Sequence, residues 1–104
     1  MPLWKEISAQ QAKEKIESGE AGIIDIRDPD SYAASHIPEA VHLNDKNAES
    51  FLVSLDKEKP LIVYCYHGIS SQGAASYLGQ RGFKEVYSLS GGFESWYHSY
   101  PTEP

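Results

Sequence analysis

The sequence contains 104 residues with a mass of 11.6 kDa, a length that fits one folded domain spanning residues 1–104. Its hydrophobic, aromatic and charged shares of 40%, 12% and 23% are typical of a globular protein and exclude collagen-like or extensively disordered chains. Nine basic residues against fifteen acidic residues give a net charge of −6. We therefore expect no binding to nucleic acid, because the phosphate backbone is recognised by clustered cations.

The sequence gives little sign of targeting to a membrane. The longest unbroken apolar run, Leu61–Tyr66, is only six residues long, whereas a membrane-spanning helix needs about 18. The first residues, Met1–Glu6, lack the basic start and apolar block of a secretory signal. These features predict a cytoplasmic protein that does not enter a membrane.

The first half of the chain alternates predicted helices and strands. Ser8 and Gln11 fit a capping box for a helix that stops at Gly19. The β-branched run Gly22–Ile26 predicts a buried strand, and Asp28–Pro29 is typical of the cap and first residue of a short helix. A brief strand and a helix with an apolar stripe follow at Val41–Leu43 and Ala48–Leu55.

The second half repeats the pattern around a more apolar strand. Leu61–Cys65 is continuously apolar, as expected for the central strand of a sheet covered on both faces. A helix then begins near Ser70 or Ser71 and stops at Gly82. The remaining predicted elements are a strand at Glu85–Ser88, a turn at Gly91–Gly92, a helix with Phe93, Trp96, Tyr97 and Tyr100 on one face, and a frayed end at Pro101–Pro104.

This alternation of strands and helices predicts an α/β fold. Strands separated by helices of about ten residues favour a parallel sheet with helices on both faces, joined by right-handed crossovers. We find no repeat, linker or low-complexity segment that would divide the chain.

The single cysteine, Cys65, is the candidate for the chemistry of this protein. One cysteine cannot form an intramolecular disulfide, so it is either an inert buried thiol or a group that reacts with an outside partner. Cys65 ends the central strand, which is where open α/β sheets carry their reactive groups. The tight reversal that follows turns backbone N–H groups toward the sulfur, and the next helix adds the positive end of its dipole. We expect a thiolate at neutral pH.

The loop after Cys65 defines the candidate binding residues. They are Tyr66, His67, Gly68, Ile69, Ser70 and Ser71. His67 either adds positive charge or is simply solvated. Cysteine phosphatases need a C-x5-R loop with a bidentate guanidinium, but here the sixth residue after Cys65 is Ser71 and the next arginine is Arg81. The smaller loop suits a single sulfur atom.

Motifs on either side of this loop resemble those of the single-domain rhodanese family. The N-terminal motif is matched by Ile24–Arg27 and Ser35–Ala40, and the C-terminal motif by Leu89–Phe93, Trp96 and Tyr100–Pro101. Within the family, the loop itself is most similar to that of small bacterial thiosulfate sulfurtransferases. The chain departs from the family pattern in three places, since Ser35 and Glu39 replace the usual glycines and Ser70 replaces a common arginine.

The resemblance implies a rhodanese-like three-layer fold with a five-stranded parallel sheet and a cysteine persulfide intermediate. Thiosulfate would donate sulfur to Cys65, and cyanide or a dithiol such as thioredoxin would accept it. No cofactor is implied. A non-catalytic protein-binding module and, after it, a cysteine phosphatase are the alternatives.

Several polar residues have a structural explanation as well as a chemical one. Asp25 and Arg27 lie at a strand end, where a structural ion pair is favoured over a catalytic role. The histidines are spread through the sequence without the spacing of a metal site, so we expect no bound metal.

Overall fold

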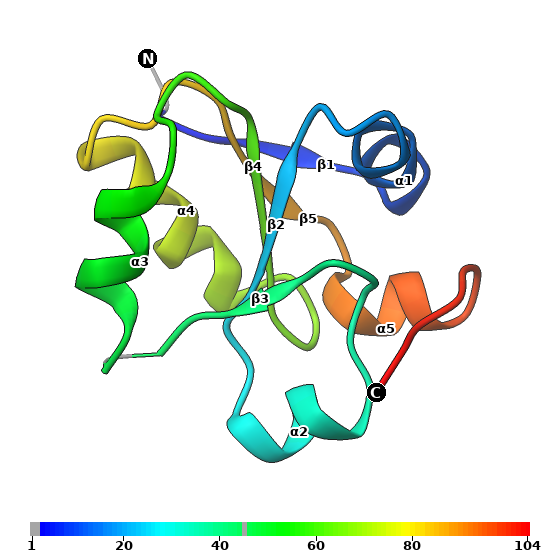
Figure 1. Ribbon diagram of the computed structural model, residues 1–104. Helices are drawn as coiled ribbons and strands as arrows, with labels where there is room; N and C mark the ends of the chain where they lie inside the picture. Colours follow the sequence, from blue (N-terminus) through cyan, green and yellow to red (C-terminus); the bar gives the residue numbers. More distant parts are fainter. Residues whose placement is uncertain (1–2, 45) are drawn as a thin grey trace.

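The computed structural model describes residues 3–44 and 46–104, so the start of the Met1–Glu6 segment lies outside the described residues. Within these ranges, a five-stranded parallel sheet is surrounded by helices (Figure 1). The strands are β1 (Lys5–Ile7), β2 (Gly22–Asp25), β3 (Val41–His42), β4 (Leu61–Tyr64) and β5 (Val86–Leu89). The helices are α1 (Ala9–Glu17), α2 (Pro29–Ala34), α3 (Ala48–Ser54), α4 (Ser70–Gln80) and α5 (Gly92–Tyr97).

The sheet has the order β1-β5-β4-β2-β3, and every neighbouring pair of strands is parallel. All four residues of β4 are buried, which confirms the prediction of an apolar central strand. One hydrophobic cluster joins the sheet to α1 and α5, and a second joins it to α3 and α4. The α/β class and the three layers are therefore as predicted.

Local signals in the sequence set several helix ends. Ser8 and Gln11 form the predicted capping box of α1, and Asp28 accepts a hydrogen bond from the Ser31 N–H at the start of α2. Gly82 follows α4 with φ of 98°, a left-handed conformation that ends the helix. None of the helices in the described ranges has the length and apolar character to cross a membrane.

Sequence patterns missed β1 and misplaced the end of α5. Two of the three residues of β1 are exposed, so this edge strand carries no apolar run that would reveal it. Tyr100 was expected to be helical, but α5 ends at Tyr97 and the N–H groups of Ser99 and Tyr100 both donate to the Trp96 carbonyl. This tighter turn still packs Tyr100 against Trp96, with ring centroids 5.1 Å apart and the rings tilted by 57°.

The C-terminal segment is also ordered, contrary to the expected frayed end at Pro101–Pro104. The backbones of His36 and Glu103 form an antiparallel bridge with N–O distances of 2.8 and 2.9 Å. The Trp96 indole donates to the Pro101 carbonyl at 2.9 Å. These bonds hold the end of the chain against the turn after α2, a long-range contact that local sequence patterns do not report.

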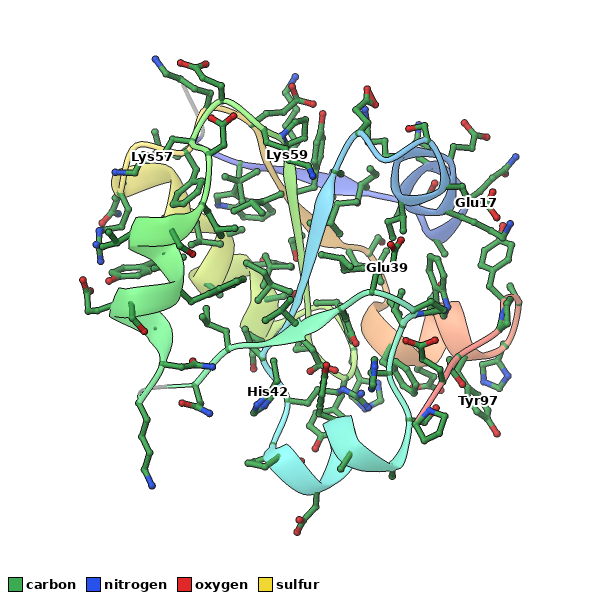
Figure 2. All side chains as sticks on the ribbon, viewed as in Figure 1. Glu17, Glu39, His42, Lys57, Lys59 and Tyr97 are labelled. Carbon is green, nitrogen blue, oxygen red and sulfur yellow. The ribbon has the colours of Figure 1, made fainter. Side chains whose placement is uncertain are left out.

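Glu39 adopts a left-handed backbone conformation, which suggests a stabilising substitution. It is the third residue of a turn in which the Ala40 N–H donates to the Ile37 carbonyl, Pro38 is second, and Glu39 has φ of 73°. Figure 2 labels its side chain beside the segment that leads into β3. Glycine is favoured at this position of a type II turn. Glu39→Gly should raise the unfolding free energy by about 0.5 to 1 kcal/mol, measured by urea denaturation; a loss of stability would contradict the expected strain.

Candidate active site

Cys65 lies at the carboxyl end of the sheet, between the ends of β2 and β5. The predicted strand ended at Cys65, but β4 ends one residue earlier at Tyr64, so Cys65 is the first residue after the strand. Cys65 is 5% exposed. In parallel sheets the chain turns into the next helix at this edge, which leaves a shallow space above the strand ends. The thiol is therefore recessed but placed at the open edge of the fold.

Hydrogen-bond donors surround the sulfur. The Gly68 and Ser71 N–H groups donate to Cys65 Sγ at 3.2 and 3.3 Å, and Ser71 Oγ lies 3.4 Å from the same atom. Burial raises the pKa of the Cys65 thiol, but the bonds from Ser71, Gly68 and His67 outweigh burial and hold the pKa below its usual value. This is the anion cradle that the sequence predicted.

The N–H groups at the start of α5 fix the shape of the cysteine loop. The Phe93 N–H donates to the Cys65 carbonyl at 2.8 Å, and the Glu94 N–H donates to the Tyr66 carbonyl at 3.1 Å. Gly92, with φ of 60°, allows this approach: a Cβ atom there would lie 2.6 Å from the Cys65 carbonyl oxygen. Gly68 has φ of 88° and is equally crowded by the backbone of Leu89 and the following turn.

A buried ion pair supports the loop from below. The carboxylate of Asp25 accepts bonds from the Arg27 guanidinium at 2.7 Å and from the Tyr64 hydroxyl at 2.6 Å. Burial, followed by the hydrogen bond to Asp25, raises the pKa of Tyr64, which stays a neutral donor. The Arg27 guanidinium also lies 3.9 Å from the centre of the Phe93 ring. The predicted ion pair of Asp25 and Arg27 is therefore present, and it packs directly against α5.

Four of the predicted binding residues form the exposed rim of the loop. They are Tyr66, His67, Ile69 and Ser70. The His67 imidazole contacts Glu94 at 2.7 Å on the surface, so its backbone, not its side chain, faces the sulfur. An apolar groove of about 250 Å3 adjoins the rim, lined by Tyr66, His67, Phe93, Glu94 and Tyr97. Figure 2 shows Tyr97 projecting outward from α5.

The loop has no guanidinium clamp for a phosphate group. Arg27 and Arg81 are the arginines of this sequence, and both lie in the described part of the chain. Arg27 is held by Asp25 and the Ser35 carbonyl, and Arg81 bonds Glu49 at 2.6 Å on the surface. Backbone N–H groups are thus the main donors to an anion at Cys65, as the six-residue spacing predicted.

Comparison with known proteins places this geometry in a family. The model of the rhodanese-like domain matches residues 8–99. The chain belongs to the rhodanese family. This rhodanese is 49% identical over 100 residues to the thiosulfate sulfurtransferase GlpE of Coxiella burnetii, an alignment that covers 96% of the chain and 94% of the relative.

Solved rhodanese-like structures share the fold of this rhodanese over nearly its whole length. The rhodanese-related protein from Thermoplasma volcanium has a TM-score of 0.81 at 26% identity and covers 96% of this chain and 98% of its own. The Alr3790 protein from Anabaena sp. has a TM-score of 0.83 at 29% identity, with 93% and 81% covered. The fold expected from the motif resemblance is therefore confirmed.

Sequence patterns missed two residues that shape the site of this rhodanese. Gly92 was assigned only to a turn, although its missing side chain admits the cysteine loop. Ser88 was assigned only to a strand, yet its hydroxyl lies 2.8 Å from Ser71 Oγ, which in turn lies 3.4 Å from the Cys65 sulfur. A polar residue facing the otherwise apolar cluster of Val86 and Ala75 is the signal that could have revealed it.

The pH dependence of Cys65 reactivity is a direct test of the cradle. Because hydrogen bonds lower the pKa of the folded thiol, the thiolate should persist to lower pH than in the unfolded chain. Iodoacetamide alkylation of the native protein should reach its plateau at lower pH than alkylation in guanidinium chloride, and should fall tenfold per pH unit only below the native pKa. Coincident profiles, or native alkylation at the slow rate of free cysteine at neutral pH, would contradict this expectation.

Proposed function

We propose that this rhodanese transfers the outer sulfur of thiosulfate, through a persulfide on Cys65, to a thiophilic acceptor with release of sulfite. The observation that carries the proposal is the recessed Cys65 sulfur with two N–H donors and one hydroxyl within 3.4 Å. The name of the Coxiella burnetii relative, a thiosulfate sulfurtransferase, supports the same donor.

The first half-reaction uses the Cys65 thiolate as a nucleophile. The thiolate attacks the outer sulfur of thiosulfate in line with its S–S bond, a new S–S bond forms to Cys65, and the old bond breaks. The bonding electron pair leaves with sulfite, so no oxidant or reductant is needed. The persulfide carries one negative charge on its terminal sulfur, and the loop N–H groups stabilise this charge as they stabilised the thiolate.

The second half-reaction returns Cys65 to the thiolate. Cyanide attacks the terminal persulfide sulfur and leaves as thiocyanate, which makes it a convenient assay acceptor. In the cell we propose a dithiol protein such as thioredoxin, whose first thiolate takes the sulfur and whose second thiol then displaces sulfide and closes a disulfide. The donor and acceptor react in turn, which predicts ping-pong kinetics.

The loop residues have separate roles in this proposal. Gly68 and Ser71 donate to the reacting sulfur through their N–H groups, and His67 contributes its N–H from the same turn. Tyr66, Ile69 and Ser70 are exposed around the opening, where they contact the incoming donor or acceptor.

Mass spectrometry of the intact protein after thiosulfate treatment tests the proposal. We expect a mass increase of one sulfur atom that cyanide removes, and no increase in Cys65→Ser. Absence of the adduct in the native protein would overturn the persulfide mechanism. An adduct that neither cyanide nor a dithiol removes would favour a non-catalytic binding module, and Cys65-dependent hydrolysis of an aryl phosphate would favour a phosphatase.

A further inference from the structure

Two buried hydroxyl groups form a chain of short contacts that ends on the Cys65 sulfur. Ser71 Oγ is 3.4 Å from Cys65 Sγ and 2.8 Å from Ser88 Oγ. The side chains of Ser71 and Ser88 are both fully buried. Ser71 lies in the first turn of α4 and Ser88 in β5, so two elements from different parts of the chain contribute to the chain of hydroxyls.

The position of Ser88 in the sheet is otherwise apolar. Val86 lies two residues earlier on the same face of β5, and Val63 of β4 pairs with Ser88 in the sheet register. On the other side Ser88 pairs with Glu6 of β1, which is exposed. A hydroxyl group in such surroundings destabilises the fold unless it forms a hydrogen bond. In the described part of the chain, the side-chain partner of Ser88 Oγ is Ser71 Oγ.

We propose that Ser88 is a positioning residue for the nucleophile: its hydroxyl donates to Ser71 Oγ and so commits the Ser71 hydroxyl to donate to Cys65 Sγ. In this order both hydroxyl protons have an acceptor, and the chain of bonds ends on the sulfur. In the reverse order, the Cys65 thiol would donate to Ser71 Oγ and the Ser71 hydroxyl would donate to Ser88 Oγ. The Ser88 hydroxyl proton would then have no side-chain acceptor among residues 3–44 and 46–104.

This order of donors favours the thiolate over the thiol. A hydrogen bond to an anion is roughly twice as strong as one between neutral groups, so the bond from Ser71 strengthens when Cys65 loses its proton to solvent. The bond from Ser88 polarises the Ser71 hydroxyl and strengthens its donation further. Ser88 thus acts on the sulfur without touching it.

Among the described residues, no charged side chain near the sulfur accounts for stabilisation of the Cys65 thiolate in place of the two hydroxyls. The loop carries His67, which is paired with Glu94 of α5 on the surface. Near the end of β2, Asp25 and Arg27 neutralise each other. The first turn of α4 carries no acidic residue, β5 is uncharged, and Glu6 of β1, which pairs with Ser88, is exposed to solvent. The two hydroxyls are therefore the polar side chains that act on the sulfur from α4 and β5.

The proposal predicts the alkylation kinetics of Ser88→Ala. Its Cys65 should react with iodoacetamide about threefold more slowly than the wild type below the thiol pKa, because the thiolate fraction falls, and its pH profile should move to higher pH. Ser71→Ala should have a larger effect, and adding Ser88→Ala to Ser71→Ala should change nothing more. An unchanged profile in Ser88→Ala, or an equal effect of Ser88→Ala in both backgrounds, would overturn the proposal.

Two comparisons separate this role from a purely structural one. Ser35→Ala, which removes the bond from Ser35 Oγ to Thr102 at 2.7 Å, should leave the alkylation profile unchanged. Ser88→Thr keeps the hydroxyl and should restore the profile lost in Ser88→Ala.

A titration of the wild-type protein tests the proposal even if Ser88→Ala does not fold. The Ser88 Cβ resonance in nuclear magnetic resonance should titrate with the same midpoint as Cys65, and a resonance that does not respond would overturn the proposal. The inference rests on the proposed function only in treating Cys65 as the nucleophile. Alkylation needs no sulfur donor, so it tests the Ser88–Ser71–Cys65 hydrogen bonds independently of sulfur transfer. If these bonds do not act on Cys65, the alkylation profile of Ser88→Ala is unchanged; if sulfur transfer fails, the persulfide adduct is absent.

Discussion

Replacing Gly92 by alanine should lower both the stability and the sulfurtransferase activity of this protein. The new Cβ atom would lie 2.6 Å from the Cys65 carbonyl oxygen and 2.7 Å from the His67 nitrogen. These are backbone atoms that cannot rotate away, and φ of 60° is itself strained for alanine. We expect a loss of about 3 kcal/mol in unfolding free energy from strain and overpacking.

The loss of activity in Gly92→Ala has a separate cause. To relieve the contact, α5 must move away from the cysteine loop, which weakens the bonds from Phe93 and Glu94 to the loop carbonyls. A displacement of a nucleophile by about 1 Å can lower the rate about 100-fold. The thiosulfate:cyanide rate and urea denaturation, measured on the same preparation, check both effects.

Gly73→Ala is the matched control for Gly92→Ala. Gly73 lies within α4, and a Cβ atom there would meet nothing within 4 Å. Alanine should raise the unfolding free energy by about 0.5 to 1 kcal/mol because it favours the helix, with activity unchanged. If Gly92→Ala behaved like Gly73→Ala, the close approach of α5 would not determine the shape of the loop.

Replacing Asp25 by asparagine should destabilise the fold strongly. Asp25 is fully buried and Arg27 is 6% exposed, so the substitution leaves the guanidinium charge buried without its partner. The Tyr64 hydroxyl also loses a charged acceptor. Breaking a buried ion pair in this way costs about 3 to 5 kcal/mol, and thermal and urea denaturation measure this loss directly.

The surface pair of Arg81 and Glu49 provides the comparison for Asp25→Asn. Its nitrogen and oxygen lie 2.6 Å apart, but the Glu49 side chain is 72% exposed. Solvent screens such a pair and already hydrates both charges, so Glu49→Ala should leave the unfolding free energy nearly unchanged. Equal effects of the two substitutions would show that burial of the Asp25 pair has no energetic importance.

The features predicted correctly are those that local sequence encodes. The apolar run of β4, the cap of α1 and the glycine after α4 each depend on residues within a few positions. The loop N–H groups that bond Cys65 were expected because a tight turn after a strand end is a local pattern as well. The Asp25–Arg27 pair was predicted for the same reason.

The features that sequence patterns missed depend on contacts between distant segments. Ser88 reaches Ser71 only because β5 pairs beside β4, and Gly92 meets the cysteine loop only because α5 folds back over it. β1 is a strand because its residues pair with those of β5, such as Ile7 with Leu89. In each case the tertiary partner, not the local propensity, decides the role of the residue.

The hydrogen bonds around the sulfur couple proton uptake to unfolding. Between the pKa of the folded Cys65 thiol and the higher pKa of the unfolded one, the folded chain holds a thiolate and the unfolded chain a thiol. Stability from this source is fully present above the unfolded pKa and is lost as pH falls through the folded pKa. In this window the calorimetric enthalpy of unfolding should be larger in Tris, whose cation gives up the proton at a high enthalpy, than in phosphate. The difference between the two buffers should narrow in Cys65→Ser.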